Sequence, residues 1–210
     1  MPKLTLPMLI SMVLASPVLG QERWPTDQLA HQMAPVFILE IPSCRELTPL
    51  LTLDSIGPVS PGESLAGLEH RCPKLYYAWD WGDEGIPEPA VAVRLGDAVA
   101  IAVLTDTIST SLIYRVRVVT EAARTEEGFG LGTLATEIID MWGEPEFGVA
   151  ECVLYMWFPA RPGLSWRLRL GSEWDCVDLA EFERTGDVGE LLRGAKVQEA
   201  ILYQSARDAV

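Results

Sequence analysis

The stretch AVAVRLGDAVAIAVL, residues 90–104, carries the strongest structural signal of this chain. Apolar side chains at positions 91, 93 and 95 alternate with Arg94, which is the period of a strand with one buried face. Gly96-Asp97 then separates two apolar runs, and such a pair is typical of a two-residue turn. The stretch therefore predicts an antiparallel β-hairpin.

Another strand and a helix are predicted on either side of this hairpin. In SLIYRVRVV, residues 111–119, Arg115 and Arg117 alternate with apolar residues and are expected on the opposite face from them. The expected apolar face consists of Leu112, Tyr114, Val116 and Val118. Before the hairpin, SLAGLEHRC, residues 64–72, predicts a short helix capped by Ser64.

The same order of elements recurs in the second half of the chain. LATEIIDMW, residues 134–142, predicts a helix that Thr133 caps and Gly143 ends. CVLYMWF and LSWRLRL flank a turn at residues 161–163 and predict a hairpin, and KVQEAILYQ predicts a last strand. A short helix is expected near residues 190–193.

These patterns predict an α+β fold with two tandem helix-on-antiparallel-sheet repeats after a cleaved signal peptide. The expected boundaries are residues 1–20 for the signal peptide, 21–124 for a lead-in with the first repeat, and 125–210 for the second repeat. The alternative is one α+β domain whose two halves are alike by chance.

The N-terminal segment predicts export. Lys3 precedes an apolar run from Leu4 to Leu14, and Val18 and Gly20 stand at the −3 and −1 positions of a cleavage site. The run is too short to span a bilayer, and no later stretch is apolar enough to do so. We therefore expect cleavage after Gly20 and a periplasmic or secreted mature protein.

The composition narrows the class of partner. The chain has 16 Lys and Arg residues against 30 Asp and Glu, for a net charge of −14 at pH 7. Such a surface repels nucleic acid and anionic lipid. Neither is therefore expected as a partner, and no membrane insertion of the mature chain is expected.

The cysteines Cys44, Cys72, Cys152 and Cys176 favour two disulfides in an exported chain. An even count of four allows three connectivities, among which we favour the local pairs Cys44–Cys72 and Cys152–Cys176. A zinc site is disfavoured because the sequence has neither a CxxC pair nor clustered histidines.

No motif of the sequence identifies a catalytic or cofactor site. GLGTLA, residues 130–135, matches a dinucleotide-binding glycine pattern, but no strand runs directly into it. There is no serine elbow, and His31 and His70 have no positioned partner. We expect a protein that is not an enzyme and has no cofactor or metal. A paired-carboxylate hydrolase and a calcium site at Asp80, Asp83 and Glu84 are the alternatives.

The strand arginines are the first candidate binding surface. Arg94, Arg115, Arg117, Arg167 and Arg169 all fall on the polar faces of predicted strands. On a shared sheet they would project from one side, where guanidinium groups bind carboxylates bidentately. The alternative is pairing across strands with acids such as Glu151 and Glu199, or burial of their stems.

Tyr77, Trp79 and Trp81 are the second candidate surface, within the aromatic and acidic segment LYYAWDWGDEGIPEP. Large aromatic side chains beside acids are typical of protein interfaces and of surfaces that stack on sugars. The alternative is that alternate members of this run point into the core.

The run GLGTLATEIIDMWGEP, residues 130–145, resembles the glycine-threonine, helix, glycine-x-proline signature of SmpA/OmlA-type small envelope proteins. Those proteins carry a lipid-modified N-terminal cysteine, whereas the first cysteine here is Cys44. The doubled arrangement also resembles the secreted β-lactamase inhibitory proteins, which stack two helix-plus-sheet repeats and grip an enzyme with a concave sheet face. The resemblance implies a binding or inhibitory scaffold, and it carries over no partner and no site residue.

We therefore expect an exported, non-catalytic protein that binds a protein partner through a sheet face or the Trp79–Trp81 edge. A structural or assembly component of the envelope is the alternative.

Overall fold

The computed structural model describes residues 43–44, 48–81, 86–105, 111–150, 152–171, 176–185 and 187–203. The described elements are three helices and eight strands: α1 (Leu65–Arg71), β1 (Tyr76–Trp81), β2 (Pro87–Leu95), β3 (Ala98–Leu104), β4 (Ile113–Val118), α2 (Ala135–Trp142), β5 (Glu146–Ala150), β6 (Val153–Trp157), β7 (Leu164–Arg169), α3 (Cys176–Thr185) and β8 (Lys196–Tyr203).

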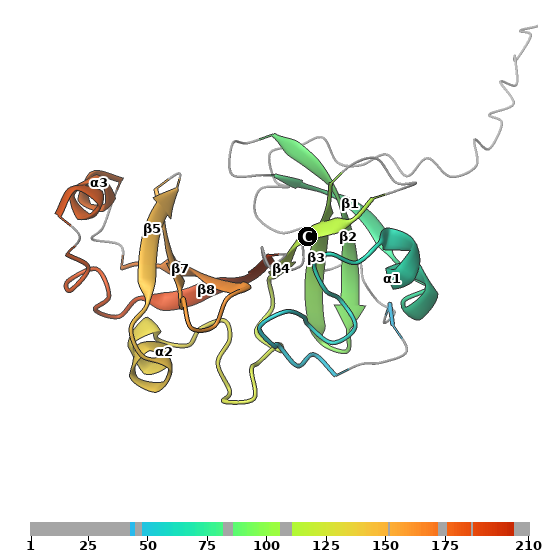
Figure 1. The fold of residues 1–210 in the computed structure, drawn as a ribbon, viewed down its shortest axis with the longest axis horizontal. Coiled ribbons are helices and arrows are strands. Elements are labelled where there is room, and N and C mark those ends of the chain that lie inside the picture. The colour runs from blue at the N-terminus through green and yellow to red at the C-terminus, as the bar shows by residue number, and fades with distance from the viewer. Residues whose placement is uncertain are drawn as a thin grey trace, which may run out of the picture.

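All the described strands belong to one sheet, in the order β1-β2-β3-β4-β8-β7-β6-β5. Every neighbouring pair is antiparallel, and β4 and β8 join the two groups of four strands in the middle. Figure 1 shows β1 to β3 on one side of this junction and β5 to β7 on the other. Helix α1 precedes the first four strands, α2 precedes β5, and α3 is inserted between β7 and β8.

The helices pack on one face of the sheet and form a single core with it. Leu68 of α1, Ile138 of α2 and Phe182 of α3 belong to the same cluster of buried residues. Its largest buried side chain is Trp166, whose ring lies 5.8 Å from that of the half-buried Trp142. The α+β class that the sequence predicts is confirmed at this level.

Several local predictions are confirmed by the backbone. The two-residue turn between β2 and β3 has Gly96 at φ 60°, a conformation that costs glycine little. Ser64 accepts a hydrogen bond from the backbone N–H of Gly67 at 3.2 Å and so caps α1. Helix α2 ends at Gly143, which has φ 92°.

The predicted apolar face of residues 111–119 is wrong at Tyr114, which does not share a face with Val116 and Val118. The register of β3 with β4 shifts between Val103 and Leu104, because Leu104 faces Ile113 while Val103 faces Arg115. Tyr114 is therefore an extra residue in a β-bulge, and it packs on the opposite face from Ile113 and Val116.

Other expected elements differ as well. Thr133 does not cap α2, because its hydroxyl accepts a hydrogen bond from the Gly130 N–H and the cap residue is Leu134. Residues 190–193 form turns rather than a helix. The sequence patterns do not predict the strands β1 and β5 or the helix α3.

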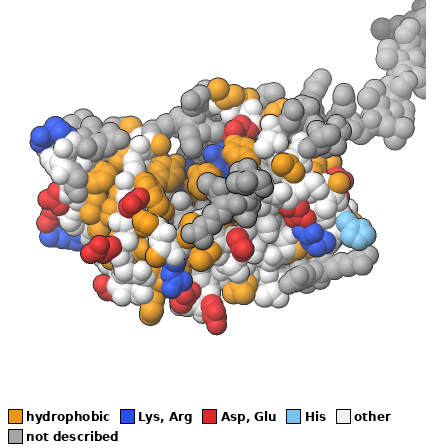
Figure 2. Space-filling view, in the orientation of Figure 1, with side chains coloured by type: hydrophobic (Ala, Val, Ile, Leu, Met, Phe, Trp, Pro, Cys, Tyr) orange, Lys and Arg blue, Asp and Glu red, His pale blue; other side chains and the backbone are white. Residues whose placement is uncertain are grey.

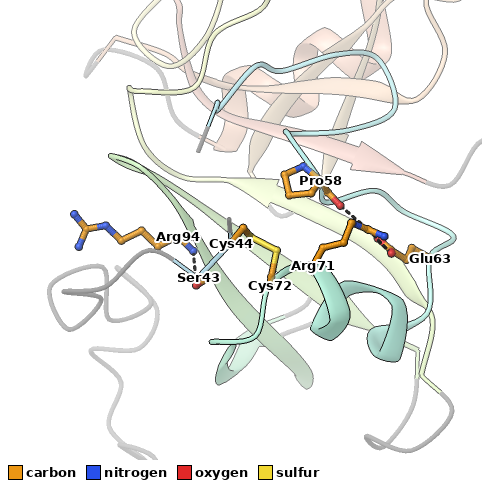
Figure 3. Close-up of a disulfide and its surroundings, with 7 residues drawn as sticks. All are labelled: Ser43, Cys44, Pro58, Glu63, Arg71, Cys72 and Arg94. Carbon is orange, nitrogen blue, oxygen red and sulfur yellow. Dashed lines mark hydrogen bonds and ion pairs between the residues drawn. A yellow bond between two sulfur atoms is a disulfide. The ribbon is translucent and has the colours of Figure 1, made fainter. Parts of the chain in front are cut away.

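The predicted disulfide between Cys44 and Cys72 is confirmed, with a sequence separation of 28. Figure 3 shows how it ties the chain at Ser43 to the end of α1. Ser43 also fastens this segment to β2: its N–H donates to the Arg94 carbonyl, and its hydroxyl accepts from the Arg94 N–H, both at 2.9 Å. Cys152 is disulfide-bonded too, and the side chain of Cys176, its expected partner, lies outside the described residues.

Some sequence predictions concern parts of the chain that the structure does not describe. These parts are the signal peptide of residues 1–20, His31, the side chain of Trp81, Asp83, Glu84 and Glu151. Among the described helices, none has the length and apolar character that crossing a membrane requires.

Candidate functional site

The sheet face opposite the helices, here called the open face, carries no described helix. Val116 and Val118 lie in the helix-side core, so Arg117 between them points to the open face. Residues opposite each other on neighbouring strands share a face. Ile101 on β3 and Ile201 on β8 stand opposite Arg117 and therefore also point to the open face. In Figure 2, hydrophobic and charged side chains are interspersed over the visible surface.

Three strand arginines and three carboxylates form an ion-pair network on the open face, here called the arginine network. Its members are Arg115, Arg117, Arg167, Asp80, Glu88 and Glu199. Arg115 donates to Asp80 at 3.0 Å and to Glu88 at 2.7 Å. Arg117 binds Asp80 and also pairs with both oxygens of Glu199. The network therefore joins β1, β2, β4, β7 and β8.

The centre of this network is shielded from solvent. The side chains of Asp80, Glu199 and Arg115 are only 4%, 5% and 6% exposed. Burial alone would lower the pKa of Arg117, but Glu199 and Asp80 raise it above its ordinary value and keep the guanidinium charged. Burial raises the pKa of Asp80, although the charges of Arg117 and Arg115 act in the opposite direction. The buried arginines and carboxylates of the network are therefore paired with one another.

Tyr114 contacts two members of the arginine network, Arg115 and Glu88. Its ring lies 5.4 Å from the Arg115 guanidinium, and its hydroxyl donates a hydrogen bond to Glu88. Burial and this hydrogen bond raise the pKa of Tyr114 above its ordinary value, so its hydroxyl stays protonated and remains a donor.

An open groove of about 250 Å³ lies over the second group of strands, and we call it the aromatic groove. Its lining residues are Gly148, Val149, Ala150, Tyr155, Trp157, Ser165 and Tyr203. The cross-strand pairs Gly148–Tyr155 and Trp157–Ser165 place small residues beside large aromatic ones. The groove is therefore a shallow hollow with aromatic walls.

The remaining predicted site residues are dispersed. Arg94 donates from Nε to the Gly96 carbonyl at 2.8 Å, and Figure 3 shows its guanidinium pointing away from the disulfide. Arg169 is exposed, in register with Lys196. Tyr77 packs on the helix-side core and donates to Glu69 at 3.1 Å. Trp79 is 49% exposed on that same side of β1, so the arginines and these aromatics do not share a surface.

The aromatic groove was not predicted from the sequence. Tyr155 and Trp157 were assigned to a hairpin strand without further role, and Tyr203 to the last strand. The available signal was that Tyr155 and Trp157 are two residues apart and point to the same face of a strand. Sequence alone gave no reason to place Tyr203 beside them.

The described residues contain no group of three side chains with metal-ligand character. Asp80, which the calcium alternative invoked, is bound to two arginines instead. In the GLGTLA segment, Arg124 donates to the Leu131 carbonyl at 2.8 Å, so an internal contact occupies this turn.

No protein-family model matches this chain, and no curated protein does either. Among solved structures, it is similar to the uncharacterized protein YfeY from Escherichia coli, with a TM-score of 0.48 and 14% sequence identity. That likeness covers 74% of this chain and 99% of the other.

Proposed function

We propose that this chain is an exported, non-catalytic binding protein that recognises a protein partner through the open face of its sheet. The observation that supports this proposal is the aromatic groove, which lies on the face opposite the core that α1, α2 and α3 share. Aromatic side chains that line a hollow on the surface are typical anchors of protein interfaces.

Export fits the chemistry of the cysteines. The Cys44–Cys72 disulfide and the bonded Cys152 belong to an oxidising compartment, which agrees with the signal peptide read from residues 1–20. Each half has a helix followed by four antiparallel strands, with α3 inserted before the last strand of the second half. This order supports the two tandem repeats and the resemblance to inhibitory scaffolds.

A structural or assembly role in the envelope is the second candidate. It is favoured by the arginine network, because side chains that pair with one another are not available to a partner. The two candidate functions differ in one respect: in the first, a protein partner covers the open face, and in the second it does not.

Site-specific photo-crosslinking in the native envelope tests the proposal. A photoreactive residue at Tyr155 samples the open face, and one at Met141, which is 64% exposed on α2, samples the helix side. We expect one protein to be crosslinked from position 155 and not from position 141, and to capture this chain in the reciprocal experiment. Equal crosslinking from both positions, or none from position 155, would contradict the proposal.

A further inference from the structure

The aromatic groove has the size and shape for one large apolar side chain. Apolar cavities of about 150 Å³ already hold a benzene ring, and this groove offers about 250 Å³. Ala150 and Ser165 leave space in the groove because their side chains are short, and Gly148, which has none, lets the Trp157 ring lie against β5. Tyr155, Trp157 and Tyr203 supply the aromatic surface around it.

Trp157 is held in place before any ligand arrives. Its indole Nε1–H donates to Glu146 at 2.9 Å, and the far end of its ring lies on Gly148. A Cβ added to Gly148 would lie 3.1 Å from two ring carbons, a tight contact that would push the ring outward by a few tenths of an ångström. An aromatic side chain fixed in this way loses little entropy on binding, which is the property of an interface anchor.

A positive strip runs beside the groove along β7 and β8. Arg167 stands opposite Tyr155, and its side chain is 31% exposed. Its one ion pair with a described residue is the 3.5 Å contact with Glu199, which Arg117 already binds. Arg169 and Lys196 are exposed, face each other across the strands, and make no ion pair with a described residue.

This strip is unusual in a protein with nearly twice as many acidic as basic residues. Like charges that face each other across two strands repel, so a bound carboxylate would relieve the repulsion between Arg169 and Lys196. Arginine side chains also suit carboxylates because their planar fork donates two parallel hydrogen bonds.

We propose that the aromatic groove receives one large apolar side chain of a protein partner, and that Arg167, Arg169 and Lys196 bind an acidic residue next to it. This inference rests on the proposed function and names the chemistry of its partner: an acidic segment with an aromatic or branched apolar anchor. It assigns recognition to the groove and the positive strip, and not to the buried centre of the arginine network.

Short peptides test this chemistry without knowledge of the partner. The probe is acetyl-Ala-Phe-Asp-Ala-amide, titrated into the full isotope-labelled protein and followed by amide and indole N–H chemical shifts. We expect shifts at Trp157, Gly148 and Arg167. Replacing Phe by Ala in the peptide is expected to weaken binding at least about tenfold, and replacing Asp by Asn about threefold.

Variants of the protein separate the two parts of the site. Ser165→Trp fills the groove and is expected to abolish the shifts, with retained spectral dispersion as the check on folding. Arg169→Gln with Lys196→Gln is expected to remove the preference for Asp over Asn while the dependence on Phe remains. Arg193→Gln, at a side chain that is 78% exposed outside the groove, is the charge control and should bind as the parent does.

Three outcomes would overturn the inference. They are equal binding of the Ala and Phe peptides, shifts confined to other parts of the sheet, and binding of an N-acetylglucosamine trimer in place of the peptide. If the photo-crosslinked partner is still captured by Ser165→Trp, the groove is not the anchor site, although recognition by the open face would stand. The failures of the two proposals are therefore distinguishable.

Discussion

Replacing Arg117 with methionine is expected to destabilise the protein strongly, although an arginine on a strand face is usually a tolerant position. Arg117 binds two carboxylates, Asp80 and Glu199, that are 4% and 5% exposed. Without it, Asp80 keeps its 3.0 Å pair with Arg115, and the one ion pair that Glu199 keeps with a described residue is the 3.5 Å contact with Arg167. Glu199 is thus left as a nearly unpaired buried charge.

The loss of stability expected for Arg117→Met follows from the buried charge of Glu199 that it leaves nearly unpaired. Removing one partner of a buried ion pair costs about 3–5 kcal/mol, because the remaining charge stays desolvated. With a denaturant dependence of about 2.5 kcal/mol per molar urea, the unfolding midpoint should fall by about 1–2 M. A surface ion pair would instead cost less than about 1 kcal/mol and shift the midpoint by less than about 0.5 M.

Urea unfolding of the oxidised protein at neutral pH, followed by tryptophan fluorescence, measures the change. The matched control is the double variant Arg117→Met with Glu199→Met, in which no lone carboxylate remains at this position. Since a buried pair replaced by apolar groups of similar volume is often neutral in stability, the double variant should recover most of the loss. A single variant within about 1 kcal/mol of the parent would refute the reasoning and make the arginines an accessible binding surface again.

Three further perturbations test other parts of the fold. Removing the Cys44–Cys72 disulfide by two serine substitutions should lower the free energy of unfolding by about 3.5 kcal/mol, from the entropy of closing a loop with a separation of 28, as measured by thermal and urea unfolding. Gly163→Ala should destabilise more than Gly194→Ala: both glycines have positive φ, but only at Gly163 would the new Cβ lie 2.4 Å from the Leu53 carbonyl oxygen. Burial raises the pKa of Glu127, but hydrogen bonds from its backbone N–H, Thr125 and Trp142 and the charge of Arg161 lower it overall. Its stabilising contribution should therefore be present above the ordinary pKa of glutamate and vanish as the pH falls through the lowered value, so the stability difference between the parent and Glu127→Gln should disappear in acid.

The elements that the sequence predicts are those in which local signals agree. The hairpin of β2 and β3 combines apolar alternation with a glycine turn, and both signals act within 15 residues of sequence, 90–104. Helix α2 combines an apolar stripe with Gly143 at its end. Such features depend little on the rest of the chain.

The missed elements depend on distant residues. The aromatic and acidic residues of β1 do not predict a strand. Asp80 on β1 is buried against Arg115 and Arg117, which lie 35 and 37 positions later in the chain. The bulge at Tyr114 likewise follows from pairing with β3, which a period-two pattern does not reveal. The groove needs Tyr203 beside Trp157 and Ser165, and the sheet order alone brings these together.

The arginine network also bears on how the two groups of strands are joined. Without the pairing of β4 with β8, each group would end in an open strand edge, which is prone to aggregation. Arg117 on β4 binds Glu199 on β8, and the two residues are 82 positions apart in the chain. If the pairing of β4 with β8 slipped by one residue, a charged side chain would turn into the apolar core. The ion pair therefore makes the observed register far more favourable than a register shifted by one residue. This accounts for charged residues that are buried and paired at the centre of the open face, where β4 meets β8.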